Sequence, residues 1–561
     1  MNNNYNTEDD YAREAEARRK RREKRRRRER IFKIVSILMI LLFLAGGALL
    51  VSHFVFHKDL WEYITPSFTS GTAENQTGMI EAPETEALTE TAEAPAQNAA
   101  DDGTVPTAEN TSAADPSRSG ADDPVNDSSS DLPAPETEAA AENTAASGDT
   151  ASVLAQADRM AMGYDYDGAI ALLKTLPGYE SLTDVTAAIS SYEETKASCV
   201  PVDVNTVPHI FYHSLINDTA SAFDVAALGQ FAVDGMNAWM TTIDEFDQIT
   251  QQMYDNGYVF VRLRDLVIQT TDENGNVHFE PNDQLLLPPG KKAVVLSIDD
   301  LSYYHSYAAA SYPDKLVLDE NGQVKCHYVK PDGTEEIGDF DVVPRLNAFL
   351  EEHPDGSYKG ARGLIALTGY NGVFGYRTDI DYKVKEKLMA DQEAWLNDHP
   401  DFNWEEDVAQ ATIIADAIKA SGWEFASHTW GHLSVTNKTA QQLQEDNEKW
   451  VNTVQNIVGP VDTIIFAHGN DIGDWQNYSS DNEKYSYFKS AGYNFFCNVD
   501  SSVPYWVQIT GDYVRQGRID LDGYQLYLSS QGQTTILDNF FRASTLFDPS
   551  RPTPVVANGE G

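Results

Sequence analysis

Short apolar runs that end in polar or ionisable residues recur through the second half of the chain. Five of them alternate with stretches of helical periodicity after Val200: "AVVLSIDD", "ARGLIALTG", "WEFASHT", "DTIIFAHG" and "YNFFCNVD". This alternation is typical of an α/β fold with parallel strands. Parallel barrel strands all end at one face, so the polar residues that close the runs gather there. The sequence therefore predicts a distorted (β/α) barrel over residues 200–546.

Local signals define further elements. "VPHIFYH" predicts the first strand, and "TIDEFDQITQQMYDNGY" predicts a helix that Thr242 caps and Asn256-Gly257 ends. Upstream, residues 151–198 carry apolar residues at helical spacing, interrupted by "LPGY", which predicts a helical hairpin. Its "YDYDGAIALLK" resembles one tetratricopeptide unit. Because a single unit cannot bury its own apolar face, we expect the hairpin to pack on the barrel.

An uncharged apolar stretch, residues 34–56, follows an Arg- and Lys-rich segment, residues 1–33. It is long enough to cross a bilayer, and the positive-inside rule keeps the basic segment in the cytoplasm. We therefore expect a single-pass signal anchor in the cell membrane, with the rest of the chain extracellular. A cleaved signal peptide is the alternative. The long basic segment, the length of the apolar run and the lack of an A-x-A site argue against it.

The remaining segments are polar. Residues 65–150 consist mostly of Ala, Glu, Thr, Ser, Asp, Pro and Asn, and predict a disordered acidic stalk. Residues 547–561 predict a frayed tail. The formal net charge of −46 excludes nucleic acid as a partner. Three scattered cysteines are too few for a disulfide framework.

Two pairs of ionisable residues close predicted strands. Asp299 and Asp300 follow "AVVLSI", and His428 and His432 stand four apart in "ASHTWGH". On a helical turn that spacing puts both imidazoles on one side, close enough to share a divalent metal ion. The sequence therefore predicts a metal site at the barrel face where these strands end.

A second pair of histidines with the same spacing, His209 and His213, lies in the first predicted strand. Four residues of a strand span about 13 Å, which is too far for both to bind one ion. We predict that His213 is a structural residue, because a buried imidazole often serves only as a hydrogen-bond partner. A place at the edge of the site is the alternative.

Several motifs in order resemble the polysaccharide deacetylases of carbohydrate esterase family 4. "VPHIFYH" and "NGYVFVRLRDL" are similar to the opening of the family pattern. "SIDD" is similar to its first motif, T-F-D-D-G, with Leu301 in place of the glycine, and "HTWGH" matches its second, H-[ST]-x-x-H. The resemblance runs from about Val207 to Leu546 and implies a barrel of the polysaccharide deacetylase type.

The resemblance also implies a chemistry. Asp300, His428 and His432 would bind one divalent ion, zinc by preference, with cobalt, nickel or iron as alternatives. Asp299 would be the general base that takes a proton from the attacking water. The implied reaction removes N-acetyl or O-acetyl groups from an extracellular polysaccharide, with N-acetylated cell-wall glycan as the expected substrate.

The chain departs from the family pattern in its later motifs. "FAHGND" stands where the third motif, R-x-P-Y, is expected, with Asn470 near the Tyr position. The family's last motif supplies a histidine as general acid, but no histidine follows His468. We predict His468 as the acid, Asp500 as a residue that orients a catalytic group, and Trp506 as a pocket residue with Asn470.

An insertion of about residues 303–375 separates the Asp pair from the His pair. It contains two strand-like runs joined by Asn321-Gly322, a strong signal for a β-hairpin. The Gly- and Tyr-rich "LTGYNGVFGYRT" predicts a loop at the barrel mouth, where Tyr370 and Tyr376 stack on sugar rings. Ordinary core packing is the alternative for each of these aromatic residues.

The sequence predicts a membrane-anchored, metal-dependent polysaccharide deacetylase. The altered third motif and the missing late histidine leave open a catalytically impaired glycan-binding or scaffold protein on the same fold. A hydrolase acting on another C–N or ester bond is a third reading. The intact Asp299, Asp300, His428 and His432 favour an enzyme, because a binding protein has no need of a base beside metal ligands.

Overall fold

The computed structural model describes residues 138–473 and 475–557. The predicted basic segment, the predicted membrane span and residues 65–137 of the predicted stalk lie outside the described residues. Within these residues, none of the helices combines the length and the apolar character needed to span a membrane. Helix α2 (Glu138–Met162) begins inside the segment predicted as a stalk, because its first turns are rich in Ala and Glu, which are strong helix formers.

Seven parallel strands close into a barrel, which confirms the predicted (β/α) barrel. Each strand pairs with the next one along the chain, and the last pairs with the first. The strands are β2 (His209–Tyr212), β7 (Lys292–Asp299), β11 (Leu364–Leu367), β12 (Glu424–Ser427), β13 (Thr463–Ile465), β14 (Phe495–Val499) and β16 (Val514–Asp520). Their carboxyl ends therefore share one face.

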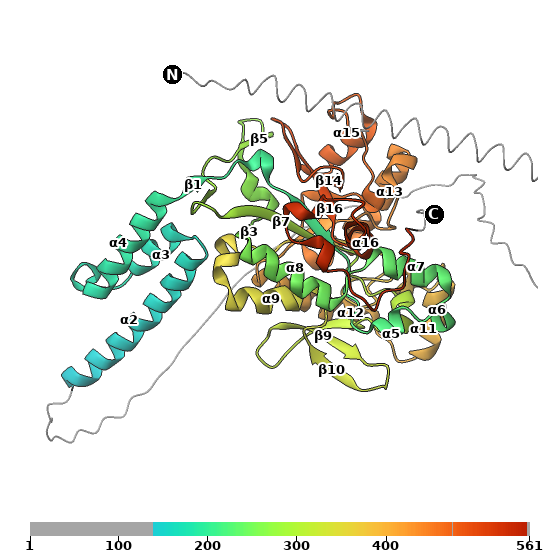
Figure 1. The fold of residues 1–561 in the computed structure, drawn as a ribbon, viewed down its shortest axis with the longest axis horizontal. Helices are drawn as coiled ribbons and strands as arrows, with labels where there is room; N and C mark the ends of the chain where they lie inside the picture. The colour runs from blue at the N-terminus through green and yellow to red at the C-terminus, as the bar shows by residue number, and fades with distance from the viewer. Residues whose placement is uncertain (1–137, 474, 558–561) are drawn as a thin grey trace, which may run out of the picture. The chain divides into compact units, whose positions relative to one another are not determined.

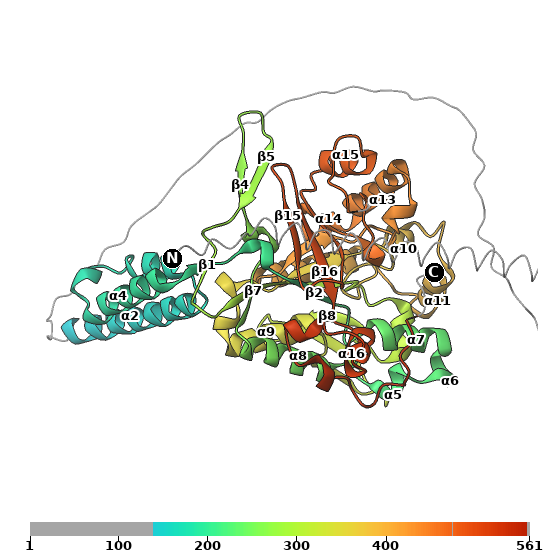
Figure 2. The same ribbon diagram turned by 45° about the horizontal axis from the view of Figure 1, so that its top comes forward.

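The barrel is distorted at β7. The first half of this strand pairs with β3 (Tyr258–Phe260), and its second half pairs with β11. On the other side of the ring, β15 (Trp506–Ile509) adds to β16 as an antiparallel strand. Two small pairings lie outside the ring: β1 (Val200–Pro201) with β6 (Leu286–Leu287), and β4 (Val267–Thr271) with β5 (Val277–Pro281), the hairpin that projects in Figure 2.

Helices surround the ring of strands (Figures 1 and 2). The longer ones are α7 (Gln230–Trp239), α8 (Ile243–Asp255), α9 (Val342–Glu352), α11 (Ala390–Asp398), α12 (Trp404–Ala420), α13 (Ala440–Thr453), α15 (Glu483–Ser490) and α16 (Gly523–Ser530). Shorter ones are α5 (Thr219–Ala222), α6 (Val225–Leu228), α10 (Ile380–Val384) and α14 (Gln455–Val458). Helix α8 has the predicted ends: Thr242 and Glu245 form a capping box, and Gly257 follows with a φ of 81°.

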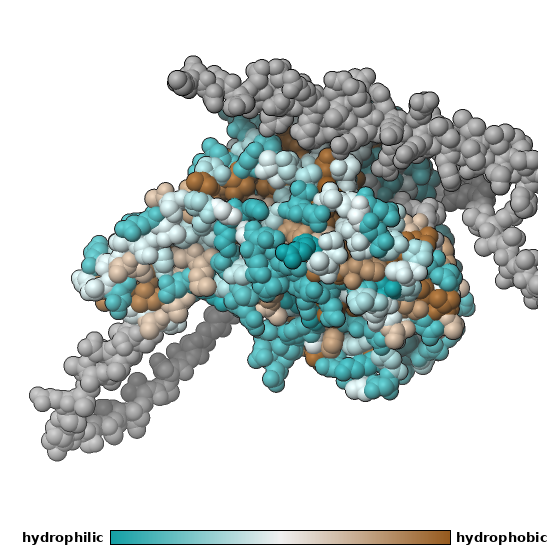
Figure 3. Space-filling model, viewed as in Figure 1, coloured by the Kyte–Doolittle hydropathy of each residue, from teal (hydrophilic) through white to brown (hydrophobic). Residues whose placement is uncertain are grey.

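The insertion carries a small antiparallel sheet. Strands β8 (Lys315–Leu318) and β9 (Val324–Val329) form the hairpin predicted around Asn321-Gly322, and β10 (Glu335–Gly338) adds a third strand. Figure 3 shows that the surface over β9 and β10 is mostly hydrophilic. Beneath the sheet, Leu316 and Cys326 are fully buried in the core that the barrel shares with α9 and α12.

The upstream helices form a three-helix unit instead of the predicted hairpin. Helices α2, α3 (Tyr166–Leu173) and α4 (Thr183–Ser198) are separated at Gly163-Tyr164 and at the predicted "LPGY" break. Tyr164 has a φ of 66°, a left-handed conformation that ends α2. As expected, the unit packs on the barrel: Leu173 and Val185 belong to the same buried cluster as barrel residues.

The segment predicted as a frayed tail is anchored through residue 551. The Arg551 guanidinium forms an ion pair with Glu245, and both side chains are fully buried. Its Nη1 also donates to the main-chain carbonyl of Asn237 at 2.9 Å. A buried charge needs its partner, so this pair holds the segment to α7 and α8.

Candidate active site

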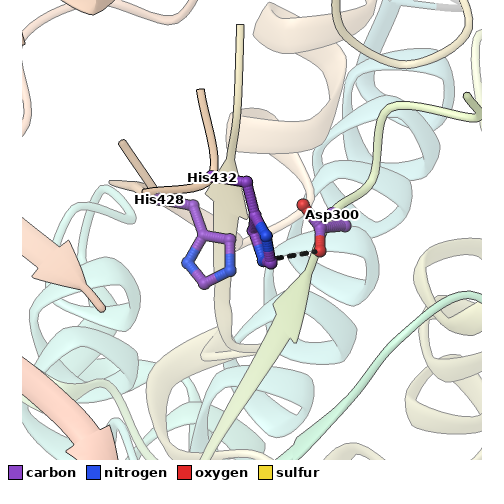
Figure 4. Close-up of side chains that lie close together, drawn as sticks. All are labelled: Asp300, His428 and His432. Atoms are coloured by element: carbon purple, nitrogen blue, oxygen red, sulfur yellow. Dashed lines mark ion pairs between the residues drawn. The ribbon is translucent and has the colours of Figure 1, made fainter. Parts of the chain in front are cut away.

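Three predicted metal ligands meet at the carboxyl ends of β7 and β12. Asp300 follows β7, and His428 and His432 follow β12. Their nearest oxygen and nitrogen atoms lie within 4.8 Å of one another. Figure 4 shows the three side chains turned toward one another, and the dashed line marks the 3.5 Å contact between His432 Nε2 and Asp300 Oδ2.

A tight turn, and not the helical turn assumed from the spacing, brings the two histidines together. Thr429 and His432 have φ values of 63° and 50°, which are left-handed. Asp446 accepts hydrogen bonds from the main-chain nitrogens of Trp430 and Gly431, at 2.6 and 2.9 Å. Strained backbone of this kind persists where the surroundings hold it, and it is common at functional sites.

The ring of His428 is fixed by a hydrogen bond behind the site. Its Nδ1–H donates to the main-chain carbonyl of Ile465 at 2.8 Å, which leaves Nε2 toward the carboxylates. Burial lowers the pKa of His428 in spite of Asp299 and Asp300, so the imidazole is neutral at pH 7. Two imidazoles and one carboxylate are donors that fit a divalent metal ion, and the prediction of this site agrees with the geometry.

Asp299 is held by an arginine that the sequence analysis did not identify. Arg518, on β16, donates from both terminal nitrogens to the two carboxylate oxygens, at 2.7 and 2.9 Å. Burial raises the pKa of Asp299, but Arg518 and then His428 outweigh it, so the pKa lies below the usual value. His428 Nε2 is 3.8 Å from Asp299. Asp299 is therefore an ionised carboxylate beside the candidate ligands.

Asp300 has its own neighbours. The hydroxyl of Tyr304 donates to its Oδ1 at 2.7 Å and also contacts Thr368. Burial raises the pKa of Asp300, but the charges of His432 and His428 have a larger, opposite effect. The pKa of Asp300 therefore lies below its usual value. Asp300 itself has a φ of 59°. It is thus ionised, oriented and held in a strained backbone position.

His213 lies closer to this chemistry than the sequence analysis predicted. It follows β2, and its charge is among those that lower the pKa of Asp299, Asp300 and Asp520. Its neighbour in the pair, His209, is fully buried and hydrogen-bonded to Ser297. The signal in the sequence that could have placed His213 near the site was its position directly after a barrel strand.

His468 lies beside the histidine pair. Its ring centroid is 4.3 Å from that of His432, and its Nε2–H donates to the main-chain carbonyl of His432 at 3.1 Å. Asn470 is occupied in joining loops, since Oδ1 accepts from Ser434 and Nδ2 donates to the carbonyl of His468. The structure therefore brings His468 to the site and gives Asn470 a supporting position.

A cavity of about 930 Å³ opens next to Asp300 and His432. Tyr370, Tyr304 and Trp430 line it, as the prediction for Tyr370 required. Tyr370 also donates to both oxygens of Asp391, at 2.8 and 2.9 Å. The cavity has room for a sugar residue, with aromatic faces beside the candidate metal site.

Tyr376 does not line this cavity, so its predicted contact with sugar is wrong. Its side chain is only 8% exposed and packs in the core under the inserted sheet. Its hydroxyl donates to the main-chain carbonyl of Leu316 at 3.0 Å. Tyr376 is buried against β8 and therefore does not reach the barrel mouth.

Asp500 and Trp506 lie on the wrong side of β16 to join Asp299. A Cβ atom on Gly517 would stand 3.3 Å from Asp500 Cβ and 3.4 Å from Trp506 Cβ, so both side chains share the face of Gly517. Side chains alternate along a strand, and Arg518 therefore points to the opposite face. Asp500 is hydrogen-bonded to Ser502. The roles predicted for Asp500 and Trp506 in the catalytic centre are not supported by this placement.

One family model matches the part of the chain that carries the two histidines of this site. Residues 401–481, which include the histidine turn and His468, match the family model "Polysaccharide deacetylase". The solved structure of the Streptococcus pyogenes deacetylase PplD in complex with acetate is similar, at 13% identity over 57% of this chain and 93% of that chain, with a TM-score of 0.27. No curated protein matches the chain. Over residues 401–481, the chain is therefore similar to the polysaccharide deacetylase family.

Proposed function

We propose that the chain is a metal-dependent hydrolase that removes N-acetyl or O-acetyl groups from an extracellular polysaccharide, with N-acetylated cell-wall glycan as its substrate. The observation that carries the proposal is the grouping of Asp300, His428 and His432 beside the ionised Asp299. A pure binding site has no need of a carboxylate base next to the metal ligands.

The three candidate ligands would hold one divalent ion, with zinc as the first choice. When bound, such an ion polarises the acyl carbonyl and makes water more acidic. The residues support this in two ways. His428 keeps Nε2 toward the site through Ile465, and Tyr304 orients Asp300.

Asp299 would accept the proton of the attacking water as that water adds to the acyl carbon. Arg518 keeps the carboxylate ionised and prevents it from rotating, since both oxygens are bound. The C–N bond then breaks, acetate leaves, and the amine nitrogen takes a proton. His468 is the predicted donor, and His213 is a second candidate because its charge also acts on Asp299 and Asp300.

The second candidate function is a glycan-binding protein of low or no activity. The hydrogen bond from His468 Nε2 to the carbonyl of His432 favours it, because this nitrogen is then not available to a substrate. The proposed location, outside the membrane on a single anchor, rests on residues 1–56 of the sequence.

The test is acetate release by the full-length chain from N-acetylglucosamine oligomers and from peptidoglycan, with zinc or cobalt and with chelator. We expect release that stops with chelator and with Asp299→Asn. Asp401→Asn makes the same chemical change at an exposed position and is the matched control. Bound metal without acetate release from any acylated glycan would favour the binding protein. His468→Gln and His213→Gln then separate the two candidate acids.

A further inference from the structure

A second cavity lies at the opposite end of the barrel. It has a volume of about 750 Å³, and Gly360 and Gly422, which precede β11 and β12, form part of its floor. The far end of α2 and the segment after β3 form its walls. The candidate active site follows the carboxyl ends of β7 and β12, so the two cavities open at different faces.

The charge of this cavity is reversed relative to the chain. The whole chain has 87 acidic and 41 basic residues. The cavity lining has only two carboxylates, Asp165 and Glu351, against six cationic side chains: Arg159, Arg262, Lys325, Lys359, Arg362 and Lys419. Cationic walls around a recess concentrate anions there.

Arg362 is the central cation. Its side chain is 7% exposed, and its nitrogens donate only to neutral oxygens. Nε donates to Asn347 Oδ1 at 3.3 Å, and Nη1 donates to Ser357 Oγ at 3.3 Å. Among the described residues, no carboxylate forms an ion pair with Arg362, whereas Arg159 and Lys359 each have one. A buried guanidinium without a counter-ion is costly, and an anion would relieve the cost.

The other cations reinforce this position. Burial lowers the pKa of Arg362 to about 10, and the charges of Arg159 and Arg262 lower it too, against the opposite effect of Glu351. Glu351 is already paired with Arg159. Arg262 donates to the carbonyl of Lys359 at 3.2 Å, and Lys359 lies 3.5 Å from Asp165. Arg262 also lies 4.0 Å from Asp265, so each of these three cations has a carboxylate, whereas Arg362 among the described residues has none.

We propose that this cavity binds a phosphate group, either free or as part of an anionic phospholipid headgroup. The arginine fork matches the oxygens of phosphate, and cations on several sides match a group of high charge better than a single carboxylate. The α2–α4 unit supplies Arg159 and Asp165, so binding would also fix this unit to the barrel. The proposal is independent of the deacetylase activity.

The test uses the metal-free full-length chain, because phosphate would also bind a metal ion in the other cavity. Titration calorimetry with inorganic phosphate, pyrophosphate and acetate measures the free anions. Sedimentation with vesicles of phosphatidylglycerol or of phosphatidylcholine measures the headgroup. We expect saturable binding of phosphate or pyrophosphate, or selective binding to phosphatidylglycerol vesicles, with acetate at least tenfold weaker.

Substitutions locate the binding. Arg362→Gln should abolish it, and Arg159→Gln combined with Lys359→Gln, at more exposed positions where folding is not at risk, should weaken it about tenfold or more. Lys330→Gln, on the inserted sheet, removes an equally exposed cation away from the cavity and should change nothing. The proposal is overturned if neither phosphate nor anionic vesicles bind, if acetate binds equally well, or if Lys330→Gln weakens binding as much as the cavity variants.

Discussion

The ion pair between Arg518 and Asp299 gives the sharpest prediction about stability. The side chains are 1% and 4% exposed, and both carboxylate oxygens are bound by the guanidinium. Arg518→Met keeps most of the side-chain volume but leaves Asp299 as a buried charge without its main partner. Breaking a buried pair in this way costs about 3–5 kcal/mol.

A double variant separates the lost charge from lost packing. Asp299→Asn combined with Arg518→Met removes both charges, and replacing a buried pair by neutral groups is often close to neutral for stability. We therefore expect the double variant to recover most of the stability, but to release no acetate, because the proposed base is absent. Arg518→Lys should recover part of the stability, since one ammonium cannot bind both oxygens.

Urea unfolding of the full-length chain, followed by far-UV circular dichroism, measures these differences at the barrel transition. Arg345→Met, which removes a partly exposed pair with Asp247, is the matched control and should cost less than about 1 kcal/mol. A loss below about 1 kcal/mol for Arg518→Met, or a double variant as unstable as the single one, would refute the reasoning.

Other predictions follow from the placement of single side chains. Tyr376→Ala should cost about 3–5 kcal/mol of stability in urea unfolding, because it empties a core position. Tyr370→Ala should cost less stability in the same assay and should raise the KM for glycan in kinetic measurements, because Tyr370 lines the cavity. Thr242→Ala should cost about 1 kcal/mol, measured the same way, because it removes half of a capping box. Burial and then Arg377 lower the pKa of His305 to about 4 from 6.5, so the unfolded chain binds more protons between these values. The Tm should therefore fall as pH drops from about 6.5 to 4, and His305→Gln should make that fall shallower; an unchanged slope would contradict the assignment.

Several features of the fold could be predicted because they are local. The alternation of apolar runs and helical stretches predicted the barrel, and Thr242 with Asn256-Gly257 predicted the ends of α8. Asn321-Gly322 predicted the hairpin of β8 and β9. Each of these signals involves neighbouring residues whose conformational preferences act over a few positions.

The grouping of the three candidate ligands could be predicted for a related reason. Asp300, His428 and His432 all follow apolar runs, and parallel strands end at one face whatever the details of packing. The predicted backbone conformation was still wrong, since a left-handed turn at Thr429 replaces the expected helical turn. Type and spacing of residues determined which side chains meet, but not the backbone that joins them.

Only the tertiary structure decided the partners of these residues. Arg518 stands 219 positions from Asp299 and meets it because the ring closes with β16 beside β2 and β2 beside β7. The same closure turned Asp500 and Trp506 to the face of Gly517. The sequence by itself determined the strands and the chemistry at their ends. Ring closure and strand register decided which charge neutralises which, because a shift of one residue along a strand turns a side chain to the opposite face.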